Sequence, residues 1–395
     1  MSNSSLLRIS AVFFLLIAFF TPTQAGQDAH DDAVVAYYAK ATADYTAGRY
    51  HEAIAAYNAA LHLKPDFAEA YNGLGVVYAL TGQYAKAVEA FTRAVRIKPR
   101  YSAAFFNLGK VYSELGRCEE AVDSFEQAAK LDPLNATVRN NLGRAYAALR
   151  RDNEAIMSLQ ESIRLKPDQA SAHNDLGALL FRQGRNTEAM ESFKRAISYD
   201  PDIFMAHYNL AWVYHRMGRH EEAVEAFTRA IRIKPNNVEA HCGLGLTWYK
   251  MGRYEEAVRA FTQAIALKPD CAEAYVLLGV TYTEMGQYEQ GIGSLKRAIE
   301  LVPNHAAAYN NLGWAYFMTG HRKEAIASFR KAVELRPELA EARYNLGIMY
   351  GLTRQREAAF IEHRMLRVLD ATLADKLLES LTGGKIVDAR NMRNK

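Results

Sequence analysis

The stretch Val238–Cys271, VEAHCGLGLTWYKMGRYEEAVRAFTQAIALKPDC, is the repeating element of this chain, and similar stretches lie directly before and after it. Its proline belongs to a series in which each member lies 34 residues from the next: Pro65, Pro99, Pro133, Pro167, Pro201, Pro235, Pro269, Pro303 and Pro337. A fixed period of this length is typical of helix pairs that stack and share one continuous core.

Every repeat carries the same pattern when its residues are counted from the repeat start. Position 7 is Leu in nine of ten repeats, position 8 is Gly or Ala, position 20 is Ala in nine, and position 24 is usually Phe. Positions 4, 7, 8 and 11 lie on one face of a helix, and positions 20, 24 and 27 lie on one face of a second helix. Glycine at position 15 separates the two helices, and the proline at position 32 ends the second.

With these residues the chain resembles the tetratricopeptide-repeat proteins, in which each repeat is a pair of antiparallel helices. The resemblance implies an all-α fold, a right-handed α-solenoid of about ten helix pairs followed by a capping helix. We expect the array at residues 34–373, with repeats that begin at 34, 68, 102, 136, 170, 204, 238, 272, 306 and 340. A terminal repeat otherwise exposes its stacking face, so the amphipathic segment 370–382 is the predicted capping helix. Residues 383–395 form a basic tail.

The first 25 residues differ in kind from the repeats. Arg8 precedes an apolar run, residues 9–20, and the small residues Thr23 and Ala25 follow it. This order is typical of a cleavable signal peptide over residues 1–25, and residues 26–33 are then a short polar lead-in. We therefore expect an exported protein, periplasmic or secreted. The alternative is an uncleaved segment in which residues 9–20 anchor the chain to a membrane.

Charge and motifs limit the function classes. The net charge is +4, with acidic and basic residues spread evenly, so we expect no nucleic-acid partner. The repeats contain no insertion that could hold a catalytic site, and the chain has no phosphate-binding loop, dinucleotide fingerprint or metalloprotease motif. We expect a protein that is not an enzyme, that binds no cofactor, and that meets a membrane only through an uncleaved signal segment.

Histidine recurs at position 4 of three successive repeats, as His173, His207 and His241. Position 4 faces the neighbouring helix, and other repeats have an aromatic residue there, so we interpret these rings as packing residues. A metal ladder is the alternative, but neighbouring helices lie about 8–10 Å apart, too far for two such rings to share an ion easily. We expect no metal site.

The three cysteines, Cys118, Cys242 and Cys271, allow at most one disulfide. We interpret them as free thiols; the alternative is a bridge between Cys242 and Cys271, which lie near the starts of adjacent first helices. Acidic residues after the prolines, as in Asp270-x-x-Glu273, have the form of a capping box. We therefore interpret the glutamates of these boxes as capping residues rather than as catalytic carboxylates.

One face of the first helix, formed by positions 2, 5, 6, 9, 12 and 13, lies opposite the packing face, and in tetratricopeptide-repeat proteins it lines a concave groove. A polar row recurs at position 6: Asn107, Asn141, Asp175, Asn209, Asn311 and Asn345. An Asn side chain can both donate to and accept from a peptide backbone, so we expect the row to hold an extended segment of a partner protein. The alternative is that these side chains only solvate the surface or persist from repeat duplication. Gly243 and Leu277 interrupt the row, which predicts two binding segments.

Aromatic residues accompany the row at positions 5 and 9: Phe106, Tyr208, Trp212, Trp314 and Tyr344. Exposed Trp and Tyr side chains often contribute most of the binding energy of an interface, so we expect these residues to contact the same partner. The Asn-Leu-Gly/Ala runs also resemble the repeat arm of the O-linked GlcNAc transferases, in which an asparagine ladder holds substrate peptides. Only that arm is matched here.

These patterns predict an exported, non-enzymatic adaptor that binds an extended segment of a partner protein. A structural scaffold or spacer in a cell-envelope complex, such as pilus or polysaccharide export machinery, is the first alternative. A substrate-delivering arm for a separate transferase is the second.

Overall fold

The computed structural model describes residues 24–382, which form 21 α-helices and no strand. The all-α fold predicted from the repeats is confirmed. The predicted signal peptide lies outside the described residues except for Gln24 and Ala25, and the basic tail, residues 383–395, lies wholly outside them. Within the described range, no helix combines the length and the apolar character needed to cross a membrane.

First and second helices alternate along the chain. The first helices are α2 (Gln24–Thr46), α4 (Ala68–Leu80), α6 (Ser102–Glu114), α8 (Ala136–Ala148), α10 (Ala170–Arg182), α12 (Phe204–Arg216), α14 (Val238–Lys250), α16 (Ala272–Glu284), α18 (Ala306–Met318) and α20 (Ala340–Leu352). The second helices are α3 (Tyr50–Leu63), α5 (Tyr84–Ile97), α7 (Cys118–Leu131), α9 (Asp152–Leu165), α11 (Asn186–Tyr199), α13 (His220–Ile233), α15 (Tyr254–Leu267), α17 (Tyr288–Leu301), α19 (Arg322–Leu335) and α21 (Arg356–Leu369). A last helix, α22, spans Ala371–Thr382.

The predicted repeat starts agree with the helix bounds. From α4 to α20, each first helix begins at the predicted first residue of its repeat. Helix α2 begins earlier, so residues 26–33, expected as a short polar lead-in, belong to a helix.

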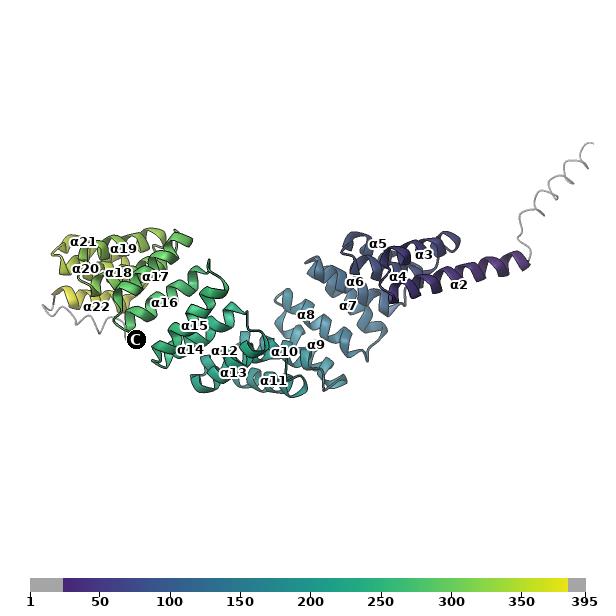
Figure 1. The fold of residues 1–395 in the computed structure, drawn as a ribbon, viewed down its shortest axis with the longest axis horizontal. Helices are drawn as coiled ribbons and strands as arrows, with labels where there is room; N and C mark the ends of the chain where they lie inside the picture. The colour runs from purple at the N-terminus through teal and green to yellow at the C-terminus, as the bar shows by residue number, and fades with distance from the viewer. Residues whose placement is uncertain (1–23, 383–395) are drawn as a thin grey trace, which may run out of the picture. The chain divides into compact units, whose positions relative to one another are not determined.

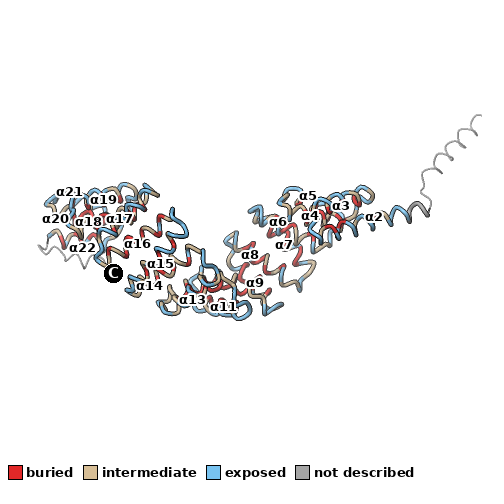
Figure 2. Tube along the Cα trace, viewed as in Figure 1, coloured by how far each residue is buried: buried red, intermediate tan, exposed pale blue. Residues whose placement is uncertain are grey.

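The chain divides into two compact bodies, residues 1–184 and residues 185–395. We call their described parts the N-terminal body, α2 to α10, and the C-terminal body, α11 to α22. Inside each body a first helix packs against the second helix of its own repeat and the second helix of the preceding repeat, and more lightly against neighbouring first helices (Figure 1). Buried residues gather along the helix faces that meet inside a body (Figure 2). Each body is thus a solenoid of stacked helix pairs.

In several repeats the core is built on an aromatic ring that lies over the glycine at position 8; in the fourth and eighth repeats Leu159 and Leu295 take the place of the ring. A Cβ atom placed on Gly75, at position 8, would lie 2.7 Å from the ring of Phe91, at position 24 of the same repeat. The same spacing separates Gly109 from Phe125, and both rings are fully buried. Position 8 must therefore be glycine in these repeats, because even a methyl group would overlap the ring.

Two repeats use a different arrangement. Position 8 is Ala41 in the first repeat and Ala211 in the sixth. In the sixth repeat the ring of Phe227 lies against position 6 of the following repeat, where a Cβ on Gly243 would be 2.5 Å away. In the first repeat, Tyr57 lies against Gly73 at the same distance. An alanine at position 8 is thus matched by a glycine at position 6 of the next repeat.

The turn between the two helices of a repeat needs a left-handed residue at position 15. Glycine fills this place in eight repeats, with φ between 70° and 79°. The other two repeats carry Arg150 and Arg354 in the same conformation, at φ 59° and 63°. The turn geometry therefore persists where the glycine is absent, at a conformational cost of about 1 kcal/mol for a residue with a side chain.

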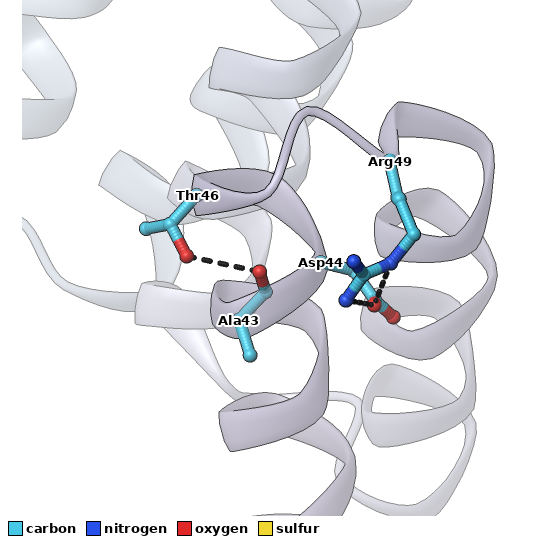
Figure 3. A network of polar contacts seen from close by, with 4 residues as sticks. All are labelled: Ala43, Asp44, Thr46 and Arg49. Atoms are coloured by element: carbon cyan, nitrogen blue, oxygen red, sulfur yellow. Dashed lines mark hydrogen bonds and ion pairs between the residues drawn. The ribbon is translucent and has the colours of Figure 1, made fainter.

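In four repeats, an arginine at position 16 lies over the aromatic residue at position 11. Arg117 lies 4.6 Å from the ring centroid of Tyr112, and Arg253 lies 4.1 Å from that of Trp248. The first repeat has Asp44 at position 11 instead, and Arg49 donates to it from Nε and Nη2 at 2.8 and 2.7 Å (Figure 3). An ion pair between a half-exposed arginine and a buried carboxylate thus replaces the cation–π contact where the second helix begins.

The predicted capping boxes, Asp66-x-x-Glu69, Asn236-x-x-Glu239 and Asp270-x-x-Glu273, do not form. Helix α16 begins after Cys271, and no side chain caps it. Helix α14 begins after Asn237 rather than Asn236, and the Asn237 side chain accepts from the Ala240 N–H at 2.7 Å. Glu69 belongs to no such box, because its repeat begins after Phe67 and its carboxylate accepts from Lys98 Nζ at 2.7 Å. This bond lowers the pKa of Glu69.

Helix α22 lies where we expected a capping helix. Its Leu377 is fully buried and packs in one cluster with Tyr344, Ile348 and Leu366 of the last repeat. A Cβ on Gly347 would lie 2.5 Å from Leu377 Cδ2. In the last repeat, a leucine of α22 therefore lies over the position-8 glycine that an aromatic ring covers in several others.

Candidate peptide-binding surface

The predicted polar row lies on the first helices and is only partly buried. The N-terminal body carries Asn107, Asn141 and Asp175, and the C-terminal body carries Asn209, Asn311 and Asn345. All six side chains are half-buried. Successive first helices within a body contact one another, so the members on α6, α8 and α10 form a continuous row in the N-terminal body.

Two row members bond to an asparagine of the preceding first helix. Asn107 Nδ2 donates to Asn72 Oδ1 at 3.0 Å, and Asn345 Nδ2 donates to Asn310 Oδ1 at 3.0 Å. Asn72 and Asn310 stand at position 5, where we expected only aromatic residues to contact a partner. A spacing of 35 residues between two asparagines is the signal that could have revealed both pairs.

The remaining row members differ in how their polar atoms are used. Asn141 Nδ2 donates to the Thr137 carbonyl of its own helix at 2.8 Å. Asp175 lies 3.7 Å from Arg144 Nε; burial raises the pKa of this carboxyl, and Arg144 opposes the rise. Within residues 29–382, the side chains of Asn209 and Asn311 make no hydrogen bond. The row therefore combines amides that link helices with amides that are free to bind.

One cleft lies on the row. It measures about 230 Å³, lies between α8 and α10, and is lined by Arg144, Asp175 and Arg182 together with alanine and leucine side chains. Arg182 also bonds to Asp152 at the start of α9. The cleft offers guanidinium donors beside a row carboxylate, which suits a carbonyl or carboxylate oxygen of a bound chain.

Two larger clefts lie away from the row, between successive second helices. One measures about 630 Å³ and is lined by residues of α7, α8 and α9, including Tyr146; the other, of about 550 Å³, includes Tyr214 and residues of α11, α12 and α13. Tyr146 donates to Glu126 at 2.5 Å, and burial and this carboxylate raise its pKa to about 12. Both clefts occupy the same place in their repeats, and we did not predict either from the sequence.

Three of the five predicted aromatic residues are partly exposed. Lys110 Nζ lies 5.9 Å from the centroid of the Phe106 ring. Tyr208 and Trp212 meet edge to face at 6.4 Å between centroids, and both lie on Phe227, at 6.0 and 5.4 Å. These half-exposed rings are supported from beneath, so their orientation is held before any partner binds.

The expectation that Trp314 and Tyr344 face a partner is wrong. Each is only 8% exposed. Trp314 packs with Phe329 of its own repeat and with Leu346 and Met349 of the next repeat, and Tyr344 packs against α22. Burial raises the pKa of Tyr344. The same positions that are exposed in an inner repeat are covered here because the neighbouring helix brings larger apolar side chains.

The gap in the row at Gly243 has a steric cause. A Cβ at this position would lie 2.5 Å from Phe227 and 3.2 Å from Trp212 Cζ2. No asparagine can stand there without moving both rings. The interruption that the sequence indicates is therefore enforced by the preceding repeat.

The three histidines at position 4 bond to backbone carbonyls. His173, His207 and His241 place Nε2 at 2.8, 3.0 and 2.9 Å from the carbonyl oxygen of the proline six residues earlier. No group of three or more metal-binding side chains comes together within the described residues.

The cysteines are free thiols. Burial raises the pKa of Cys242 to about 12, and the neighbouring Cys271 adds to the rise. A thiol with so high a pKa is protonated at neutral pH and therefore a poor nucleophile.

Two family models together match the chain over most of its length. The family model for the tetratricopeptide repeat matches residues 38–102 and 106–170, and the model for the C-terminal domain of cilia and flagella-associated protein 70 matches residues 146–366, more than half of the chain. No curated protein matches it.

Solved structures also resemble parts of the chain. MamA is 30% identical, with 42% of this chain and 97% of that chain covered and a TM-score of 0.40. YrrB, described as a TPR protein with an unusual peptide-binding site, is 22% identical, with 47% and 96% covered and a TM-score of 0.41. PilF of Pseudomonas aeruginosa is 19% identical, with 56% and 96% covered and a TM-score of 0.47.

Proposed function

Because the chain belongs to the tetratricopeptide-repeat family, we propose that it is a non-enzymatic adaptor whose first helices bind an extended segment of another protein. Proteins of this family are typically non-catalytic scaffolds that bind peptides or proteins. The observation that carries the proposal is the polar row, whose half-buried side chains recur from helix to helix inside a body.

The spacing of the row suits an extended chain. Neighbouring helices lie about 8–10 Å apart, and an extended peptide advances about 3.3 Å per residue. A segment laid across α6, α8 and α10 therefore meets a row member at roughly every third residue. Asn107 and Asn141 use one amide hydrogen internally and keep their oxygen available, so they can bond to backbone groups regardless of the partner's side chains.

The surroundings of the row add positive charge. Lys110 and Arg144 are exposed beside it in the N-terminal body, and Arg182 lines the cleft between α8 and α10. These groups favour backbone carbonyls and acidic side chains of the bound segment over basic ones.

Crosslinking in the native compartment followed by mass spectrometry identifies partners, and binding of the captured partner to variants tests the role of the row. We expect Asn107, Asn141 and Asn209, changed together to Ala, to weaken binding at least about tenfold. The matched control changes Arg93, Gln127 and Arg195 to Ala, three exposed positions on second helices, and should leave binding unchanged. If the row variant folds by circular dichroism and binds every captured partner as tightly as wild type, the row is not the binding surface.

We further propose that the adaptor works outside the cytoplasm, in the periplasm or as a secreted protein. The support is the sequence of residues 1–25, with Arg8, the apolar residues 9–20 and the small residues Thr23 and Ala25. Mass spectrometry of the N-terminus after cell fractionation tests this. A mature chain that begins at Gly26 in an exported fraction supports it, whereas an intact Met1 in the cytoplasm contradicts it.

A scaffold in an envelope complex is the second candidate function, and the two clefts between second helices favour it. They occupy equivalent places in different repeats, at Tyr146 and Tyr214. Under this alternative, Met157→Glu at the rim of the first cleft should reduce partner capture while the row variant does not. The two functions therefore predict opposite results for the same pair of variants.

A further inference from the structure

Helix α21, the second helix of the last repeat, carries an exposed apolar stripe. Ile361 is 48% exposed, Met365 is 47% exposed and Val368 is 88% exposed. Their spacing places them on one face of the helix. The stripe extends over about 10 Å, the rise of seven helical residues.

The same face is mostly polar in the preceding repeats, although position 22 is Met157 in the fourth. Ile361, Met365 and Val368 stand at positions 22, 26 and 29. From the second to the ninth repeat, position 26 holds only charged or amide residues: Arg93, Gln127, Glu161, Arg195, Arg229, Gln263, Arg297 and Lys331. The stripe is therefore a local departure at the end of the array, on a face that water covers elsewhere. Contiguous apolar surface of this kind indicates a contact with another molecule.

The residues of the stripe follow a heptad pattern. Ala358, Ile361, Met365 and Val368 alternate by three and four residues, as the a and d positions of a coiled coil do. Arg364 occupies the flanking g position; it is exposed and makes no ion pair with the described residues. Arg367, nearby on the same side, is also exposed. The pattern fits a partner helix with its own apolar seam, and the arginines favour acidic residues along its edge.

A second copy of this chain fits less well. In an antiparallel pair whose seams overlap fully, the g positions of the two helices face each other. Arg364 of one copy would then face Arg364 of the other, and the like charges oppose the pairing. The chain's own tail, residues 383–395, carries four basic residues and one acidic residue, so it has the wrong charge to cover the stripe.

A membrane surface also fits less well. Glu357 lies on the same side of α21 as Arg364, at the edge of the apolar face, and would be brought against lipid headgroups. An anionic lipid surface would cover the whole edge and meet this carboxylate, whereas a partner helix can place its acidic residues opposite Arg364 and Arg367 alone. We propose that α21 is a docking surface for an amphipathic helix of another protein, with apolar residues at heptad spacing and acidic residues beside them.

Two synthetic peptides test the proposal on the full chain. Both have three heptads with Leu at a and d, and they differ in carrying either Glu or Lys at the flanking e and g positions. Fluorescence anisotropy should show that wild type binds the Glu peptide at least about tenfold more tightly than the Lys peptide. Met365→Lys with Val368→Lys should remove this binding, and Arg364→Glu should transfer the preference to the Lys peptide.

The control variant is Lys331→Glu, which changes the equivalent, partly exposed position on α19 and should bind both peptides as wild type does. Equal binding of the two peptides by wild type, or unchanged binding by Met365→Lys with Val368→Lys, overturns the proposal. Sedimentation velocity and co-sedimentation with phosphatidylcholine–phosphatidylglycerol vesicles test the other occupants. Suppose that wild type binds neither peptide but forms a dimer or binds the vesicles, and that Met365→Lys with Val368→Lys abolishes the dimer or the lipid binding. The stripe is then assigned to a second copy or to lipid instead.

Discussion

The second and sixth repeats solve the same packing problem in different ways. In the second repeat Gly75 makes room for Phe91 inside the repeat, and the following repeat carries Asn107 at position 6. In the sixth repeat Ala211 takes the glycine's place, Phe227 lies against the next repeat, and position 6 there is Gly243. One ring can be accommodated in either place. In the sixth repeat the ring excludes a side chain from position 6 of the next repeat and stops the polar row there, whereas in the second repeat that position is left open for Asn107.

The largest expected effect comes from imposing the sixth repeat's alanine on the second. Gly75→Ala places a methyl group 2.7 Å from the Phe91 ring, and Asn107 occupies position 6 of the next repeat. We expect a destabilisation of about 2–3 kcal/mol, because the core is overpacked. Hydrogen exchange of α4, α5 and α6 measures it, since all three tryptophans lie in the C-terminal body. Unchanged protection of these helices would show that the ring moves freely.

Gly243→Asn should be nearly as harmful, at about 2 kcal/mol, because its side chain would overlap Phe227 and Trp212. Ala211→Gly in the same chain should recover part of this loss by allowing Phe227 to lie over position 8. The double-mutant cycle, followed by tryptophan fluorescence in urea, measures the coupling. Simple additivity of the two changes would refute the link between the two positions. If Gly243→Asn with Ala211→Gly regains stability, its asparagine at position 6 would also extend the polar row into the seventh repeat.

Within the row, asparagines that link helices should differ from those that do not. Asn107→Ala removes the bond to Asn72 and should cost about 1 kcal/mol. Asn311→Ala removes no hydrogen bond and should change stability by less than about 0.5 kcal/mol. Urea unfolding monitored by circular dichroism compares the two variants. Equal losses would mean that the Asn107–Asn72 bond contributes nothing to stability.

The smallest effect concerns Asp175, whose pKa is raised by burial. A raised carboxyl pKa means that the ionised form costs stability, so this cost is present at neutral pH and vanishes as the pH falls below the ordinary range for Asp. Asp175→Asn should therefore raise the melting temperature slightly at pH 7, by a change of less than about 1 kcal/mol. The difference from wild type should shrink towards pH 3. A variant that melts lower than wild type at pH 7 would show that the pairing with Arg144 outweighs burial.

The exposure of Trp212 and of Trp314 could not be predicted from their place in the repeat. Both occupy position 9 of their repeats, and we expected both to face a partner. Both are followed by a repeat with Leu at position 7. Position 10 of that repeat is Thr247 after Trp212, which remains half-exposed, and Met349 after Trp314, which is buried in one cluster with Met349. A residue's own position in the period does not reveal the size of the side chains that the next helix places over it.

Local periodicity, with proline and glycine at set places, is enough to predict the repeat length, the start of each first helix from α4 to α20 and the row at position 6. Only the tertiary structure decided which asparagines bond across helices, which aromatic rings are covered, and why Gly243 interrupts the row. Those properties depend on pairs of residues about one repeat apart, such as Asn72 with Asn107 and Ala211 with Gly243. Packing, unlike periodicity, is settled between neighbouring helices rather than within one.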